Sequence, residues 1–208
     1  MSNLIIVRHG QSEWNLENRF TGSSDIELTA AGEIEAKNAG KLIRNYPLDE
    51  AFTSVLARAV HTLTIILKEI DGMSMPVTKS ACLNERSYGD LQGLNKIEMI
   101  KKYGSAQVLS WRRGYDTVPP GGESLKDTYN RVVPYYKKEI EPKLRAGKNI
   151  LIVAHGNSLR ALMMYLEKIS ETNIADINLA TGAPRLYEFD SSMVISRVSY
   201  VNQPISDI

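Results

Sequence analysis

Two of the three histidines in this 208-residue chain stand in matching sequence contexts. The segments "LIIVRHGQS" (4–12) and "ILIVAHGNS" (150–158) each place a His-Gly pair directly after a run of apolar residues. If these runs are neighbouring parallel strands, His9 and His155 meet at the carboxyl edge of the sheet, where α/β proteins bind ligands. The helix that follows each pair offers free backbone N–H groups to an anion. We therefore expect the two imidazoles to share one anionic ligand.

Several cationic side chains are available to hold such an anion. The candidates are Arg8, Arg58, Lys96, Arg112 and Arg113. Arginine suits bidentate contacts with phosphate and carboxylate oxygens, and lysine supplies a compact positive charge. The paired arginines lie within "WRRG" (111–114), in a segment predicted to be irregular, and they show no helical ion-pair spacing. We expect this pair to contact a ligand.

A metal site is the main alternative for the histidines, since three imidazoles can bind zinc. Arg8 and Arg58 would place positive charge beside the ion, and no carboxylate accompanies any of the histidines, so we expect no metal. His61, three residues after Arg58 in a predicted helix, is interpreted as a structural or supporting residue. Cys82 is the only cysteine, which excludes an internal disulfide, and it is interpreted as a core residue.

Strands and helices that would position these residues alternate along the chain. Unbroken apolar runs predict buried strands over 4–7 and 150–153, and further strands are predicted over 51–53, 186–189 and 194–201. Four helices are predicted. The first begins after Thr29 and has a face of small residues, and the second runs from Ser54 to about residue 70. The third begins at 123–124 and is kinked at Pro134, and the fourth follows "HGNS" and ends at about residue 168. The pattern predicts an α/β fold with three α/β/α layers and a mostly parallel central sheet.

One domain over residues 1–208 is expected, because no linker or low-complexity segment divides the chain. Residues 84–122 mix Gly, Pro, charges and aromatics, and they are predicted to form loops with a short helix over 96–103. Long irregular insertions of this kind are often lids or binding loops. A surface excursion without function fits the composition equally well, and we carry a lid over the site as the expectation for this segment.

The overall charge and hydropathy exclude several classes of partner. A formal net charge of +1 gives no general field for nucleic acid or an anionic membrane. No apolar run approaches the length of a membrane span, and the first residues lack a signal-peptide pattern. We expect a cytoplasmic protein that binds neither nucleic acid nor membranes.

Five blocks of sequence carry a resemblance to a known family. They are "RHGQSEWNLENRFTG", "TSVLARAVHT", "NERSYGDLQGLNK", "WRRG" and "AHGNSLRAL". Together they resemble the histidine phosphatase superfamily, specifically the 2,3-bisphosphoglycerate-dependent phosphoglycerate mutases, over nearly the whole chain. The resemblance implies the phosphoglycerate mutase-like fold. It also implies interconversion of 3-phosphoglycerate and 2-phosphoglycerate, in glycolysis and gluconeogenesis, through a phosphohistidine primed by 2,3-bisphosphoglycerate.

The resemblance also implies roles for individual residues. His9 would be the nucleophile and Glu85 the proton donor and acceptor, while Arg8, Arg58 and a protonated His155 would surround the transferring phosphoryl group. Neighbouring arginines lower the pKa of an imidazole below its usual value of about 6.5, which keeps the nucleophile neutral. The implied substrate contacts are Gln11, Ser12, Asn15, Thr21, Gly22, Arg86, Tyr88, Lys96, Arg112, Arg113, Gly156 and Asn157.

The partners implied by the resemblance are a small phosphorylated three-carbon acid and further copies of the chain, as a dimer or tetramer. Two features depart from the family pattern. Gln11 stands where many members have Glu, and the join from Arg113 to Ser124 is shorter than in the longer mutases. We expect Gln11 to keep its role. Since the longer loop helps to cover the site, its shortening predicts mutase activity with a larger phosphatase side reaction.

Two other functions remain open from the sequence. One is a phosphomonoesterase that uses the same phosphohistidine; Lys96 and the arginine pair argue against it, because they suit the carboxylate of a small acid. The other is a non-catalytic phosphoryl-binding protein. The presence of both His9 and Glu85 argues against that function.

Overall fold

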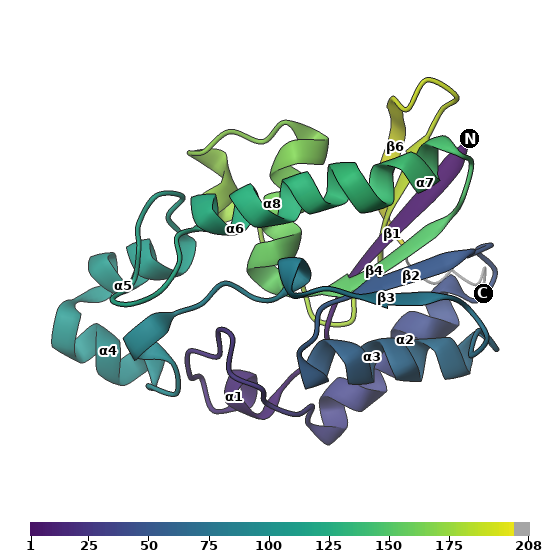
Figure 1. Ribbon diagram of the computed structural model, residues 1–208. Helices are drawn as coiled ribbons and strands as arrows, with labels where there is room; N and C mark the ends of the chain where they lie inside the picture. The colour runs from purple at the N-terminus through teal and green to yellow at the C-terminus, as the bar shows by residue number, and fades with distance from the viewer. Residues whose placement is uncertain (202–208) are drawn as a thin grey trace, which may run out of the picture.

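A six-stranded sheet forms the centre of the protein in the computed structural model, which describes residues 1–201 (Figure 1). The expected single domain reaches residue 208, so its last seven residues lie outside the described range. The strand order is β3-β2-β4-β1-β5-β6. The strands are β1 (Ser2–Arg8), β2 (Glu50–Thr53), β3 (Val77–Lys79), β4 (Ile150–Ala154), β5 (Arg185–Phe189) and β6 (Ile195–Tyr200).

The two histidine-bearing strands are direct neighbours. β1 and β4 pair in parallel, with Arg8 opposite Ala154, so the His-Gly pairs that follow leave the sheet side by side. On its other side β1 pairs with the antiparallel strand β5, whereas β2, β3 and β4 run parallel to β1. The mostly parallel sheet and the meeting of the two strand ends are confirmed.

Helices cover both faces of the sheet (Figure 1). One face packs against α2 (Ala30–Ile43) and α3 (Ala57–Glu69), and the other packs against α6 (Leu125–Tyr135), α7 (Glu141–Arg145) and α8 (Gly156–Glu167). Alternate strand residues point to opposite faces. Leu4 and Ile6 therefore join the α6–α8 core, while Ile5 and Val7 join the α2–α3 core. This arrangement confirms the three-layer α/β/α architecture.

A separate small core supports the long excursion after β3. Phe20, Leu91, Met99, Val108 and Trp111 pack together beneath α4 (Lys96–Tyr103) and α5 (Ser105–Arg113). These helices and the short α1 (Glu13–Leu16) lie beyond the carboxyl ends of the parallel strands (Figure 1). Residues 84–122, which were expected to form loops and one short helix, therefore pack against their own apolar cluster. They do so at the carboxyl edge of the sheet, where the site was expected.

Several predicted boundaries need correction. α5 is a helix where an irregular segment was predicted, and Arg112 and Arg113 form its last turn. The predicted cap Ser54 is not the N-cap of α3; that position is Leu56, and the first helical N–H, at Ala57, donates to Asp25 instead. The Ser54 hydroxyl contacts His155 and accepts from the N–H of Leu56, the N-cap residue itself.

The remaining differences concern short or continuous elements. β3 and α1 were not predicted, because three exposed edge residues and a single helical turn carry little periodic signal. The helix after Ser124 continues through Pro134 into a π-helical stretch (Tyr136–Ile140) and then α7, which places an irregularity next to the predicted kink. Within residues 1–201, no helix has the length and apolar composition to span a bilayer.

Candidate active site

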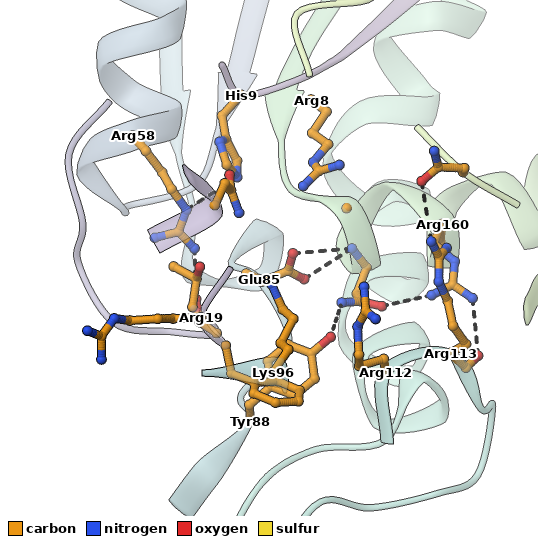
Figure 2. Close-up of a pocket in the computed structure, with 17 residues that line it drawn as sticks. Arg8, His9, Arg19, Arg58, Glu85, Tyr88, Lys96, Arg112, Arg113 and Arg160 are labelled. Atoms are coloured by element: carbon orange, nitrogen blue, oxygen red, sulfur yellow. Dashed lines mark hydrogen bonds between the residues drawn. The ribbon is translucent and has the colours of Figure 1, made fainter. Parts of the chain in front are cut away.

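A cavity of about 200 Å³ opens at the carboxyl edge of β1 and β4 (Figure 2). Residues from widely separated segments of the chain line it. The lining residues are Arg8, His9, Asn15, Arg19, Phe20, Thr21, Gly22, Arg58, Glu85, Tyr88, Lys96, Arg112, Arg113, Gly156, Asn157, Arg160 and Asn178. Most of the residues that the sequence singled out therefore meet in one cavity.

His9 is held with its Nε2 atom available as a nucleophile. Its Nδ1 lies 2.7 Å from the carbonyl oxygen of Gly10, so Nδ1 carries the proton that it donates there, and the lone pair remains on Nε2. Burial, together with the charges of Arg58 and Arg8, holds the pKa of His9 well below its usual value. The imidazole is therefore neutral at neutral pH, as the nucleophilic role requires.

Arg58 contacts this nucleophilic nitrogen directly. Its Nε lies 3.3 Å from Nε2 of His9, while Nη1 and Nη2 donate to the carbonyl oxygens of Ser24 and Gly22 at 2.7 Å. The guanidinium is fully buried, and burial lowers the pKa of Arg58 to about 10, which leaves it charged. It thus places a fixed positive charge beside the attacking atom and holds the 22–24 turn at the cavity wall.

The backbone around His9 is fixed by close packing on two helices. The N–H of Gly10 donates to Oγ1 of Thr62, which in turn donates to the carbonyl of Arg58. Gly10 also lies against Gly32 of α2 so closely that a Cβ at Gly10 would come within 2.2 Å of the Gly32 carbonyl oxygen. The predicted small-residue face of α2 therefore brings that helix into direct contact with the His-Gly turn.

His155 lies beneath His9 and does not line the cavity itself. The ring centroids are 4.9 Å apart, and Nε2 of His155 is 2.7 Å from Oγ of Ser54. Burial, followed by the charge of Arg58, holds the pKa of His155 well below its usual value, so the expected protonated form is wrong. Ser54 Oγ also accepts from Leu56 N, and a hydroxyl can accept a second hydrogen bond, so either atom can be the donor in its contact with Nε2. Nδ1 of His155 has no hydrogen-bond partner among the described residues.

Arg8 and Glu85 face each other across Gly156. A Cβ at Gly156 would lie 3.6 Å from Oε2 of Glu85 and 3.7 Å from Nε of Arg8. Arg8 donates from Nη1 to the Leu179 carbonyl, while its buried Nε has no hydrogen-bond partner among residues 1–201. A buried unpaired N–H is costly, so an anion oxygen placed there would be stabilised.

The Glu85 carboxylate sits at the N-terminus of α8. Oε1 accepts from the backbone N–H of Arg86 at 2.8 Å and from that of Asn157 at 3.0 Å. A ligand anion was expected at this helix end, and the structure places the side chain of Glu85 there instead. Glu85 is 9% exposed and reaches the cavity, as a proton donor and acceptor must.

A second cationic group lines the other side of the cavity (Figure 2). Arg113 donates to the Ile177 carbonyl and to Asn178, and Arg160 donates to Asn157. Burial, followed by the charge of Arg112, lowers the pKa of Lys96 to about 8. These cations, from α4, α5 and α8, surround a space where a second anionic group would be held.

Three predicted substrate contacts do not line the cavity. Oε1 of Gln11 accepts from the Thr29 hydroxyl, and the backbone N–H of Ser12 donates to Asn15. Arg86 is fully buried and donates to the carbonyls of Trp111 and Arg112, which supports the end of α5 from behind. His61 likewise lies outside, between two glutamates of the surface, as expected for a structural residue.

Four lining residues were not predicted. They are Arg19, Phe20, Arg160 and Asn178. Arg160 had a detectable signal, because it lies three residues after Asn157 in the helix that follows the second His-Gly pair and so shares its face. Asn178 comes from a loop after α8 and carries no such pattern.

The lining is strongly cationic. Among residues 1–201 it contains seven Arg and Lys side chains and one carboxylate, that of Glu85. This composition favours a ligand with several negative charges and gives a poor donor set for a divalent metal, which prefers carboxylate, imidazole or thiolate ligands.

Comparisons with known proteins identify the family of the chain. The family model "Histidine phosphatase superfamily (branch 1)" matches residues 4–198. A Cytophaga hutchinsonii protein named 2,3-bisphosphoglycerate-dependent phosphoglycerate mutase is 62% identical, over 97% of this chain and 94% of its own length. A Nitrobacter winogradskyi protein of the same name is 54% identical, over 93% of this chain and 94% of its own length.

A solved structure also shares the fold. The mycobacterial glucosyl-3-phosphoglycerate phosphatase in complex with VO3 superposes with a TM-score of 0.83 at 24% identity, over 98% of this chain and 99% of that one. At that identity the likeness supports the fold alone. The family model and the sequence relatives show that the chain belongs to branch 1 of the histidine phosphatase superfamily and, within it, to the family of 2,3-bisphosphoglycerate-dependent phosphoglycerate mutases.

Proposed function

We propose that this protein is a phosphoglycerate mutase that interconverts 3-phosphoglycerate and 2-phosphoglycerate through a phosphohistidine on His9, primed by 2,3-bisphosphoglycerate. One observation carries the proposal. A single cavity holds the neutral imidazole of His9 beside Arg8 and Arg58, and a second group of cations, from α4, α5 and α8, lies on its other side. A ligand with anionic groups at both ends fits that distribution. The names of the sequence relatives support the same reaction.

The first half of the cycle loads the enzyme. Nε2 of His9 attacks the phosphorus of one phosphoryl group of 2,3-bisphosphoglycerate, and the bond from phosphorus to the ester oxygen breaks. Glu85 gives its proton to that oxygen, which leaves as the hydroxyl of a monophosphoglycerate. Arg8 and Arg58 supply positive charge to the transferring oxygens, while His155, which lies outside the cavity lining, supports the His9 ring from beneath.

The second half isomerises the substrate. The free hydroxyl of a bound monophosphoglycerate attacks the phosphorus on His9, and Glu85 accepts the hydroxyl proton. The bisphosphorylated product then turns within the cavity and presents its other phosphoryl group to Nε2. Nε2 takes up that group as its bond to the ester oxygen breaks, Glu85 returns the proton to that oxygen, and the isomeric monophosphoglycerate leaves. Because the cations occupy both sides of the cavity, either end of the intermediate is held while the other reacts.

Phosphatase activity is the second function that an observation favours. None of the described residues 114–123 lines the cavity. This short segment instead packs against residues 87–90, with Asp90 N donating to the Pro120 carbonyl and Glu123 N to that of Ser87. Water can therefore compete for the phosphohistidine, so we propose that hydrolysis accompanies isomerisation.

An assay that follows both products tests the function. The protein is primed with 2,3-bisphosphoglycerate and given 3-phosphoglycerate, and 2-phosphoglycerate and free phosphate are measured in the same reaction. Formation of 2-phosphoglycerate as the main product, with slower release of phosphate, is expected. Free phosphate alone would identify a hydrolase, and neither product would identify a non-catalytic binding protein.

Three further attributes belong to this proposal. The reaction takes place in the cytoplasm as a step of glycolysis and gluconeogenesis, and it needs no metal, in keeping with the cationic cavity. The chain assembles as a dimer or tetramer, for which the edge strand β3, with three exposed residues, offers backbone groups on the side away from β2. Light scattering after size-exclusion chromatography tests the assembly.

A further inference from the structure

Arg131, in α6, lies outside the cavity lining but hydrogen-bonds the backbone of the segment that carries Glu85. Its Nη1 donates to the carbonyls of Cys82 at 2.9 Å and Asn84 at 3.0 Å, and its Nη2 donates to that of Glu85 at 3.1 Å. One guanidinium thus binds three carbonyl oxygens within four residues. Such a contact needs the flat, forked geometry of arginine.

Glu123 completes the contact on the other side of Glu85. Its Oε1 accepts from Nε of Arg131 at 3.2 Å, and its Oε2 accepts from Nη2 at 3.1 Å and from the backbone N–H of Ser87 at 2.9 Å. Arg131 and Glu123 together, which we call the clamp, therefore fix the backbone both before and after Glu85.

Apolar packing does not fix this part of the segment. Leu83 is buried in the core, but behind the residues that follow it lies a second cavity of about 310 Å³. The walls of that cavity include Glu85 and Ser87 together with both members of the clamp. With open space there, the position of the Glu85 backbone depends on polar contacts.

The carboxylate of Glu85 depends in turn on its backbone. It accepts from Asn157 N in α8 at 3.0 Å, and no hydrogen bond among residues 1–201 joins the clamp to that helix. A shift of the 84–87 backbone would therefore move the carboxylate relative to α8, and so relative to Arg8 and His9. Displacements of about 1 Å can cost about 100-fold in rate.

We propose that Arg131, held by Glu123, is a positioning residue for Glu85 and sets the alignment of the proton donor with the ester oxygen of the substrate. The inference rests on the proposed function, because it assigns Glu85 to proton transfer. It adds a residue outside the cavity to the catalytic apparatus. The effect is specific: it acts on steps that need a proton and spares those that do not.

The test compares two phosphoryl donors whose leaving groups differ. Transfer from 2,3-bisphosphoglycerate to His9 needs Glu85 to protonate an alkoxide, whereas p-nitrophenyl phosphate releases a stable phenolate without that proton. Arg131→Lys keeps the charge and loses the fork, and Glu123→Gln keeps the shape and loses the charge. We expect each to slow the first reaction, by about 100-fold for Arg131→Lys, and the second by less than about threefold. Arg145→Lys, at an exposed ion pair of α7, is the matched control.

A double variant separates positioning from general damage. If the clamp acts through Glu85, Glu85→Gln combined with Arg131→Lys is no slower with 2,3-bisphosphoglycerate than Glu85→Gln alone, because residues that act as a unit are not additive. Additive losses, equal losses with both donors, or no loss in either clamp variant would overturn the inference. If Glu85→Gln itself slows both donors equally, the proton-transfer role of Glu85 fails, and the inference fails with it. Glu123→Gln decides the matter if Arg131→Lys does not fold.

Discussion

The contact between Gly10 and Gly32 should be intolerant of a single methyl group. An ideal Cβ at Gly10 would lie 2.2 Å from the Gly32 carbonyl oxygen, and one at Gly32 would lie 2.1 Å from that of Gln11, whereas ordinary contact begins at 3.4 Å. Backbone must therefore retreat by about 1.2 Å in either variant. Overpacking of this kind costs about 1–3 kcal/mol. Only Gly32 lies in a helix, where Ala recovers at most about 1 kcal/mol of that cost.

Both stability and activity should report this displacement. For a chain of this size, the expected cost lowers the melting temperature of Gly10→Ala and Gly32→Ala by roughly 2–12 °C. The same shift carries His9 away from Arg58, so phosphoenzyme formation should slow by about 100-fold in both variants. Circular dichroism melts and rapid-quench measurements of phosphohistidine give the two quantities.

The same substitution at Gly156 provides the control. Its nearest neighbours, Glu85 and Arg8, would be 3.6 Å or more from the new Cβ, which is ordinary contact. Gly156→Ala should therefore melt like the wild type and still lose activity, because its methyl group lies between the two catalytic side chains. Wild-type melting in both Gly10→Ala and Gly32→Ala, or equal destabilisation of Gly156→Ala, would refute the close-packing explanation.

Three further predictions follow from the charges in the site. Burial and neighbouring cations lower the pKa of Lys96 to about 8, so KM for the anionic substrate should rise between pH 7.5 and 9, and Lys96→Arg should remove that rise. Because the pKa values of His9 and His155 are lowered in the folded state, the unfolded chain binds more protons than the folded protein below about pH 6.5. The free energy of unfolding, measured by chemical denaturation, should therefore fall as the pH decreases from 7.5 to 5.5. It should fall less in His155→Asn. Mutase activity should be unchanged by a chelator, and its loss would restore the metal alternative.

Much of the fold was predictable because its central strands are buried on both faces. The unbroken apolar runs before His9 and His155 can only be strands or buried helix segments, and their shortness decides for strands. β3 could not be found in this way, since all its residues are exposed. α5 was missed because Gly104 and Gly114 enclose a mostly polar stretch, although Val108 and Trp111 bury one helical face.

The site was predictable to the extent that motifs carry it. The sequence placed His9, Arg58 and Glu85 correctly in one cavity, but it could not show that His155 is buried and neutral. That property depends on burial and on the charge of Arg58, a residue of a different helix. The contact of His155 with Ser54, which was expected to cap a helix, likewise joins positions 101 apart. Supporting contacts between distant segments have no local signature, and the same applies to the clamp formed by Arg131.

The central claim is that His9, and not His155, carries the phosphoryl group. The protein is incubated with 2,3-bisphosphoglycerate, digested at alkaline pH and analysed by mass spectrometry for acid-labile phosphate on each histidine. We predict phosphate on Nε2 of His9, its complete loss in His9→Ala, and slower but detectable labelling of His9 in His155→Ala. Labelling of His155, or a phosphoenzyme that persists in His9→Ala, would contradict the account.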